Sequence, residues 1–299
     1  MYKIAVNLLS GILVILFLIF LKLIGKRKAS NICSYFFTKL GPHTRFNQRA
    51  IKNISFIWPK KKQEEINKIT KKMWNNLGRN FGEFVHLYKF NPELCQDTNI
   101  NGLRKVKALF QKNKKMKKGI IFFSAHYGNW EMGAPILKKL GLKPLCLYRK
   151  SNNKIIENII QKIRNSNGEY APKGDIGAKR SFLWLRKGKS LALLMDQKLN
   201  EGPAIEFLGK KANTASFIAD IALKMDLDII PIKIKRESNL KNSITFLNKI
   251  EMPNNKLNKN EKVNFILKKI NTIISSWILE DPSQWLWIHR RWTKDIYKT

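Results

Sequence analysis

The stretch GIIFFSAHYGNWEMGAPILKKL, residues 119–140, has the pattern of a strand, a polar turn and a helix in succession. Its apolar run, Ile120–Phe123, is typical of a strand whose two faces are both covered. Gly128 and Asn129 supply turn chemistry, and the positions from Met132 onward suit a helix. A strand that leads through a short loop into a helix is the repeating unit of an α/β protein.

The same alternation continues along the chain. Further strands are predicted at Pro144–Tyr148, Ser190–Asp196, Asp228–Lys235 and Ser243–Ile250, and further helices at 152–165, Ile176–Arg186, Thr214–Met225 and Lys262–Trp277. Residues 29–92 read as helical, because their apolar side chains recur on one stripe. The sequence therefore predicts an α/β fold, with a mostly parallel sheet core flanked by helices, in one domain that covers residues 29–299.

Residues 1–28 form a different segment. Ile4–Leu21 carries no charge and would be about 27 Å long as a helix, close to the thickness of the hydrocarbon core of a bilayer. Basic residues, Lys22 and Lys26–Lys28, follow this run, whereas a signal peptide carries its charges first. We therefore expect one uncleaved N-terminal transmembrane helix, with the rest of the protein on the cytoplasmic side. A buried or interfacial helix is the alternative.

The net charge is +36, from 57 Lys+Arg against 21 Asp+Glu. A field of this sign attracts nucleic acid, anionic lipid or an acidic protein. A compositional bias toward Asn, Lys and Ile explains part of the excess. The three cysteines are widely spaced and form no C-x-x-C pair, so neither a zinc ribbon nor a redox motif is indicated.

Ligand and catalytic sites of parallel sheets form beyond the carboxyl ends of the strands. Six polar residues are predicted to reach such a crevice: His126, Glu131, Arg149, Arg164, Asp196 and Gln197. His126 is the residue type of a general base near neutral pH, and Glu131 is a candidate partner to fix its tautomer. Five residues along a straight helix would separate the two side chains by about 140°, so their pairing requires the turn at Gly128. From residue types alone, a structural histidine remains the alternative.

Other chemistries lack support. The chain has no G-x-S-x-G nucleophile elbow, no G-x-x-x-x-G-K-[ST] phosphate loop and no H-E-x-x-H zinc helix. The remaining histidines are far apart in the sequence, and we expect neither a metal nor a cofactor. The segment PSQWLWIHRRW, residues 282–292, has the composition of a stacking surface for nucleic acid. Beside an N-terminal anchor, a membrane interface or core packing is the favoured interpretation.

Several stretches resemble the lipid A biosynthesis acyltransferases, the family that adds lauroyl- or myristoyl-type chains to a lipid A precursor. SAHYGNWEM, residues 124–132, is similar to the H-x4-(D/E) signature of this family, with Glu in the place of the acid. Arg164 falls where the family has an arginine. The other similar stretches, in order, are NNLGRNFGEF (75–84), LYRKSNN (147–153), LRKGKSLALLMDQK (185–198), EFLGKKANTA (206–215) and PSQWLWIHRRW (282–292).

The resemblance implies a glycerolipid-acyltransferase-like fold at the cytoplasmic face of the bacterial inner membrane. It implies transfer of an acyl chain from acyl carrier protein to a hydroxyl of a lipid A precursor, without a cofactor. His126 would take the proton of the hydroxyl, and Glu131 would orient His126. Arg149 and Arg164 would bind phosphate or carboxylate groups or stabilise the oxyanion, and Asp196 would hold an arginine.

The residues leave two alternatives open. A related membrane acyltransferase could act on another lipid or glycolipid acceptor with the same His/acid chemistry. A membrane-tethered nucleic-acid-binding protein would also account for the net charge of +36, although the resemblance implies no nucleic-acid partner.

Overall fold

The computed structural model describes residues 2–89, 98–116, 118–142 and 144–297. Its centre is a seven-stranded sheet in the order β1-β9-β8-β2-β5-β3-β4. The strands are β1 (Thr98–Asn101), β2 (Ile120–Ser124), β3 (Pro144–Tyr148), β4 (Glu169–Pro172), β5 (Ser190–Leu194), β8 (Asp228–Arg236) and β9 (Asn242–Phe246). Neighbouring strands pair in parallel except β8 with β9. The predicted α/β fold with a mostly parallel sheet is confirmed.

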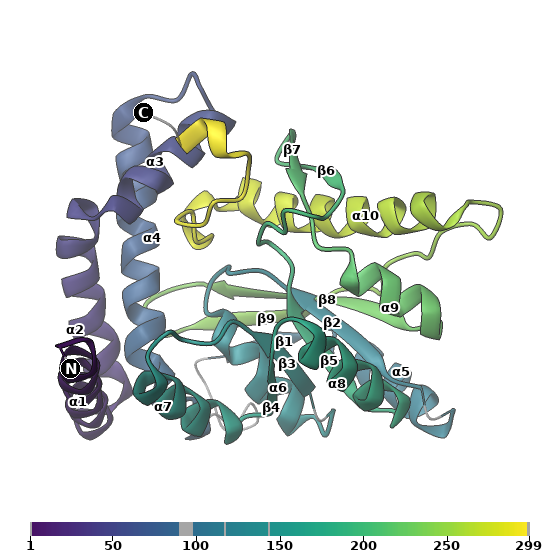
Figure 1. Ribbon diagram of the computed structural model, residues 1–299, viewed down its shortest axis with the longest axis horizontal. Coiled ribbons are helices and arrows are strands. Elements are labelled where there is room, and N and C mark those ends of the chain that lie inside the picture. The colour runs from purple at the N-terminus through teal and green to yellow at the C-terminus, as the bar shows by residue number, and fades with distance from the viewer. Residues whose placement is uncertain (1, 90–97, 117, 143, 298–299) are drawn as a thin grey trace.

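Helices cover both faces of this sheet. They are α5 (Leu103–Lys115), α6 (Gly133–Lys139), α7 (Lys154–Asn165), α8 (Asp175–Arg186), α9 (Phe217–Met225) and α10 (Lys259–Glu280), of which α10 runs along one face (Figure 1). Ile121 and Phe123 of β2 belong to a core that includes side chains of α8, α9 and α10. Ile120 and Phe122 point into a second core, with side chains of α5 and α6. The apolar run of β2 is therefore continuous because both of its faces are buried.

Three helices, α2 (Gly25–Leu40), α3 (Arg45–Ile57) and α4 (Gln63–Phe84), stand beside the sheet (Figure 1). They account for most of the helical segment predicted at 29–92, whose last three residues lie outside the described part of the chain. Helices α2 and α4 pack closely because Gly78 and Gly82 face the backbone of Cys33 and Ala29. This packing holds α4 beside the carboxyl end of β2, where Asn76 and Asn80 of α4 contact the loop that follows the strand.

Helix α1 (Tyr2–Leu23) contains the predicted transmembrane segment. Within the described residues, no helix combines the length and the apolar character that crossing a membrane requires. The predicted transmembrane anchor is therefore not supported. Leu18 and Leu21 of α1 are buried against Ala29, Cys33 and neighbouring side chains, so α1 packs on the body of the protein.

Several elements were not predicted from the sequence. They are β1, α5, β4 and a separate antiparallel hairpin of β6 (Ala204–Phe207) and β7 (Lys210–Asn213). The short strands β1 and β4 read TNIN and EYAP, and neither contains an apolar run. The hairpin turns at Leu208 and Gly209, both with positive φ, a conformation that glycine adopts readily and leucine does not.

We predict that Gly82→Ala lowers the free energy of unfolding by about 1–3 kcal/mol, as overpacking typically does. A Cβ at position 82 would lie 2.3 Å from the carbonyl oxygen of Ala29. Urea denaturation would measure the change. Gly133→Ala is the control, because its Cβ would meet no atom nearer than 3.6 Å. Equal stability of the two variants would contradict the close packing of α2 on α4.

Candidate active site

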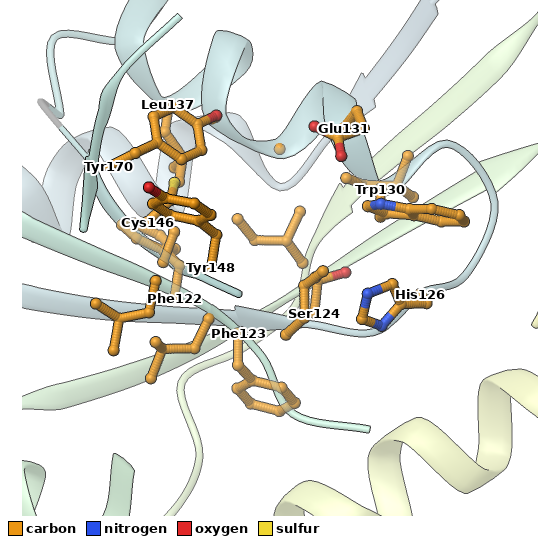
Figure 2. Close-up of a pocket in the computed structure, with 18 of the residues that line it drawn as sticks. Phe122, Phe123, Ser124, His126, Trp130, Glu131, Leu137, Cys146, Tyr148 and Tyr170 are labelled. Carbon is orange, nitrogen blue, oxygen red and sulfur yellow. The ribbon is translucent and has the colours of Figure 1, made fainter. Parts of the chain in front are cut away.

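The strands that carry the candidate residues lie side by side. β2 and β5 pair in parallel, with Ser124 opposite Leu194. Two residues further on, the two chains reach His126 and Asp196. Because parallel neighbours end at the same edge of a sheet, these side chains meet there. Figure 2 shows His126 at one end of a pocket, beside Trp130.

Asp196 is fully buried and accepts hydrogen bonds from two residues. Nδ1 of His126 lies 2.9 Å from its Oδ1, and the backbone N–H of His126 donates to its Oδ2 at 3.0 Å. Nε1 of Trp285 donates to the same Oδ2 at 2.8 Å. The family resemblance implied that Asp196 holds an arginine, but the structure places its carboxylate against His126.

Burial alone would raise the pKa of Asp196, but the charge and the hydrogen bond of His126 outweigh it. With smaller contributions from His289 and Trp285, they hold the pKa of this carboxyl well below its usual range. The ionised carboxylate accepts the hydrogen on Nδ1 of His126, which leaves the lone pair on Nε2. His126 can therefore take up a proton at Nε2.

Glu131, the partner expected for His126, forms a different pair. Nη2 of Arg164 donates to Oε1 of Glu131 at 2.6 Å, and no hydrogen bond joins Glu131 to His126 in the part of the chain that is described. Burial acts to lower the pKa of Arg164, but Glu131 outweighs it and raises that pKa, so the guanidinium stays charged. Three aromatic rings have centroids 5.6–6.0 Å from the guanidinium carbon, those of Phe84, Tyr148 and Tyr170.

A cavity of about 260 Å³ opens beside His126. Five of the six predicted site residues line it: His126, Glu131, Arg149, Arg164 and Gln197. Asp196 instead lies buried behind His126. Figure 2 shows Phe122, Cys146 and Tyr170 at the end of the pocket away from His126. The cavity therefore joins a polar end, which holds the histidine, to a largely apolar end.

Lys173 is a site residue that the sequence reasoning missed. It follows β4 at its carboxyl end and lines the same cavity as Arg149. Its Nζ donates to Oε1 of Gln197 at 3.0 Å. The position after a parallel strand was the available signal, but β4 itself carries no apolar run. Together, Lys173 and Arg149 give the cavity a cationic side.

The C-terminal segment packs beside His126. The rings of Trp285, Trp287 and Trp292 are buried. Core packing is therefore the correct interpretation of this segment, and a membrane interface is not. The buried rings also offer no stacking surface for nucleic acid. Their packing partners include α3, where Nδ2 of Asn53 donates to the carbonyl oxygen of Trp287 at 2.6 Å, and Phe207 of β6. The ring of His289 lies 4.8 Å from that of His126. Burial, followed by the charge of His126, lowers the pKa of His289 to about 4, so it is neutral at physiological pH.

The loop after β2 is fixed through its backbone. Gly128 has a φ of +56°, and a Cβ there would lie 2.0 Å from the carbonyl oxygen of Ile234. Its N–H donates to the carbonyl oxygen of Gln284 at 3.0 Å. Its own carbonyl oxygen accepts from Nδ2 of Asn80 at 2.6 Å and of Asn76 at 3.2 Å. The turn that the sequence required at Gly128 is thus present and tightly enclosed.

A buried ion pair lies beneath this loop. Arg236 at the end of β8 donates to both carboxylate oxygens of Glu83, at 2.8 and 3.1 Å, and to Asn76 and Asn80, each at 2.7 Å. Nδ2 of Asn129 also donates to Glu83, at 2.8 Å, and does not cap the following helix. The guanidinium therefore orients the two asparagines that hold the carbonyl of Gly128.

We predict that Arg236→Met lowers the free energy of unfolding by about 3–5 kcal/mol, because it leaves the carboxylate of Glu83 buried without its cation. Chemical denaturation would measure this loss. Lys269→Met removes the cation of an exposed pair, Lys269–Glu251, and should cost less than about 1 kcal/mol. A similar small effect in both variants would show that the buried pair does not stabilise the fold.

Among the described residues, no group of three or more His, Cys, Asp or Glu is arranged to hold a metal ion. The family model of the bacterial lipid A biosynthesis acyltransferases matches residues 3–294, and no curated protein matches the chain. The match extends over almost the whole sequence and confirms the resemblance seen in its motifs. The protein with this His126–Asp196 site thus belongs to the bacterial lipid A biosynthesis acyltransferases and is an O-acyltransferase.

Proposed function

We propose that the protein transfers a fatty acyl chain from the thioester of acyl carrier protein to a hydroxyl of a lipid A precursor, with His126 as general base. The observation that carries this proposal is the pairing of His126 with buried Asp196 at the polar end of a cavity with an apolar far end. A base, a route for a hydroxyl and an apolar recess are the parts that O-acylation by a fatty thioester requires.

The proton moves in two steps. Nε2 of His126 accepts the proton of the acceptor hydroxyl while its oxygen attacks the thioester carbonyl carbon. Asp196 stabilises the imidazolium that forms, in the manner of the carboxylate of a Ser-His-Asp triad. The tetrahedral intermediate then collapses, the carbon–sulfur bond breaks, and the imidazolium returns the proton to the leaving sulfur. The products are the ester and the free thiol of the carrier.

The cationic side of the cavity suits the negative charges of this reaction. Arg149 and Lys173 line the cavity with His126. They are the candidates for stabilising the oxyanion or for binding phosphate and carboxylate groups of the acceptor. Arg164 is held by Glu131, so we assign this pair to shaping the cavity wall. In this proposal, Glu131 positions Arg164. Asp196, and not Glu131, orients the imidazole of His126.

The apolar end of the cavity suits the acyl chain. Its walls include Phe122 and Ile232 on the sheet and Leu137 on α6. Burial of a chain here would exclude water from the thioester carbonyl. Such a recess supports a fatty acyl donor over a short polar one.

A membrane surface is the proposed location, on the cytoplasmic face of the bacterial inner membrane. Large apolar side chains are exposed on α1 and on α2, among them Leu13, Leu16, Tyr35 and Phe36. Basic residues lie close by in the sequence, at 26–28. Apolar side chains beside cations are typical of a surface that binds anionic lipid. The net charge of +36 also favours association with acidic acyl carrier protein.

The decisive assay incubates the protein with a lipid A precursor and a panel of acyl carrier protein thioesters and reads the products by mass. We expect the mass of the acceptor to rise by one acyl group with at least one donor, and His126→Ala to abolish that gain because the base is lost. No product with any donor would contradict this acceptor, and full activity of His126→Ala would contradict the mechanism.

We predict that Asp196→Asn lowers kcat by about 10²- to 10⁴-fold, because the amide no longer fixes the tautomer of His126 or stabilises its imidazolium. The acid limb of its pH–rate profile should move to lower pH, since a buried negative charge beside the imidazole is removed. Glu131→Gln is the comparison. It should keep the wild-type pH profile, because Glu131 contacts Arg164. The reverse pattern, with the shift in Glu131→Gln alone, would make Glu131 the partner of His126.

A further inference from the structure

A second apolar groove lies between α1 and α7, two helices that pack side by side (Figure 1). It has a volume of about 490 Å³. Ile15, Leu18 and Ile19 of α1 line one side, and Ile159 and Ile163 of α7 line the other. Within the described part of the chain, none of its lining residues is acidic.

The apolar stripe of α7 is incompletely covered. It consists of Ile155, Ile156, Ile159, Ile160 and Ile163, and none of these side chains is fully buried. Isoleucine side chains aligned on one face of a helix normally face a core. Helix α1 touches this stripe where Gly11 meets Ile155, but between Ile15 and Ile159 the groove remains open. The stripe therefore has room for a further apolar group.

Positive charge surrounds the groove. Lys22 and Lys162 are exposed residues of its lining. Lys138 donates from Nζ to the carbonyl oxygen of Ser166, another lining residue, at 2.7 Å. Neither Lys22 nor Lys162 forms a salt bridge with a carboxylate in the described part of the chain. Nζ of Lys22 lies 5.1 Å from the ring centroid of Tyr88, another lining residue. An apolar groove whose rim carries lysines without a carboxylate partner among the described residues is complementary to a molecule with a hydrocarbon chain and an anionic head.

We propose that this groove binds one fatty acyl chain of an anionic membrane phospholipid, with the phosphate beside Lys22, Lys138 and Lys162. The groove continues into exposed apolar side chains of α1, including Ile12, Leu16 and Leu23. The chain of a bilayer lipid would therefore enter from the same face that the protein presents to the membrane.

The groove is separate from the cavity of the catalytic histidine. Arg164 of α7 reaches Glu131 in the catalytic cavity, whereas Ile159 of the same helix lines the groove. Five residues along a helix turn the side chain by about 140°, so the two sites occupy different faces of α7. This geometry favours a lipid that anchors the protein over an acceptor whose hydroxyl must reach His126, and the inference holds whichever acceptor is acylated.

The test measures lipid retained by the full-length protein. Vesicles of phosphatidylcholine, with or without phosphatidylglycerol, are mixed with the protein, which is then extracted in detergent and examined by native mass spectrometry. We expect phosphatidylglycerol to stay bound to the wild type. Lys22→Gln with Lys162→Gln should weaken its binding roughly 10- to 30-fold, the effect of two surface lysines on anionic lipid. Ile159→Trp should abolish retention, because the indole fills the groove.

Two controls separate a specific site from the general positive field. Lys107→Gln with Lys112→Gln makes the same charge change on exposed positions of α5 and should leave retention unchanged. Ile176→Trp places an indole at an exposed site on α8 and should also have no effect. An equal loss of retention in the α5 variant would overturn the proposal.

The acceptor provides the last comparison. Ile159→Trp should leave the KM for the acceptor in detergent unchanged, because the groove holds a phospholipid. A raised KM together with normal phosphatidylglycerol retention would assign the groove to the acceptor and overturn the proposal. Thermal unfolding checks that the Ile159→Trp variant is folded. If it is not, the Lys22→Gln with Lys162→Gln variant still tests the site, because phosphatidylglycerol retention is measured on it separately. Because the acyl-transfer assay is separate, failure of the lipid site does not imply failure of the proposed function.

Discussion

The carboxylate of Asp196 joins three parts of the chain that are remote in sequence. It lies after β5, it accepts from the side chain and backbone of His126 after β2, and it accepts from Trp285 in the C-terminal segment. A buried charge is costly unless each of its lone pairs is used. The fully buried position of Asp196 therefore requires both the histidine and the tryptophan to be in place, and the position of the His126 imidazole follows from this requirement.

The loop that carries His126 is restrained from the other side by α4 and β8. Asn76 and Asn80 hold the carbonyl of Gly128, and Arg236 orients both asparagines while it pairs with Glu83. The two asparagines and Glu83 belong to α4, and Arg236 belongs to β8, so a helix and a strand together hold the loop. A side chain held within a narrow range of positions loses little entropy when a ligand binds beside it, and such preorganisation is what the proposed general-base role of His126 needs.

Charge is distributed unevenly around the two faces of α7. On one face Arg164 is neutralised by Glu131, while Arg149 and Lys173 line the cavity beside them. On the other face Lys22 and Lys162 border an apolar groove. From the sequence, the excess of basic residues suited several kinds of polyanion. In the structure, basic residues lie at the cavity beside His126 and at the groove between α1 and α7, and both places suit anionic lipids. The burial of Trp285, Trp287 and Trp292 removes the rings that would have favoured nucleic acid.

Local patterns in the sequence were enough to predict the sheet-forming strands with long apolar runs, the helices between them, and the crevice at their carboxyl ends. Those signals are local, because hydrophobic periodicity reports burial within one element. The short strands β1 and β4 were not predicted because they lack such runs. Lys173 was missed as a site residue because it follows β4.

The tertiary structure alone decided that His126 pairs with Asp196 and Glu131 with Arg164. The register of β2 on β5 sets the first pair, and the packing of α7 beside the loop sets the second. Neither can be read from a spacing of five residues, because hydrogen bonds between distant segments depend on how the elements are assembled in space.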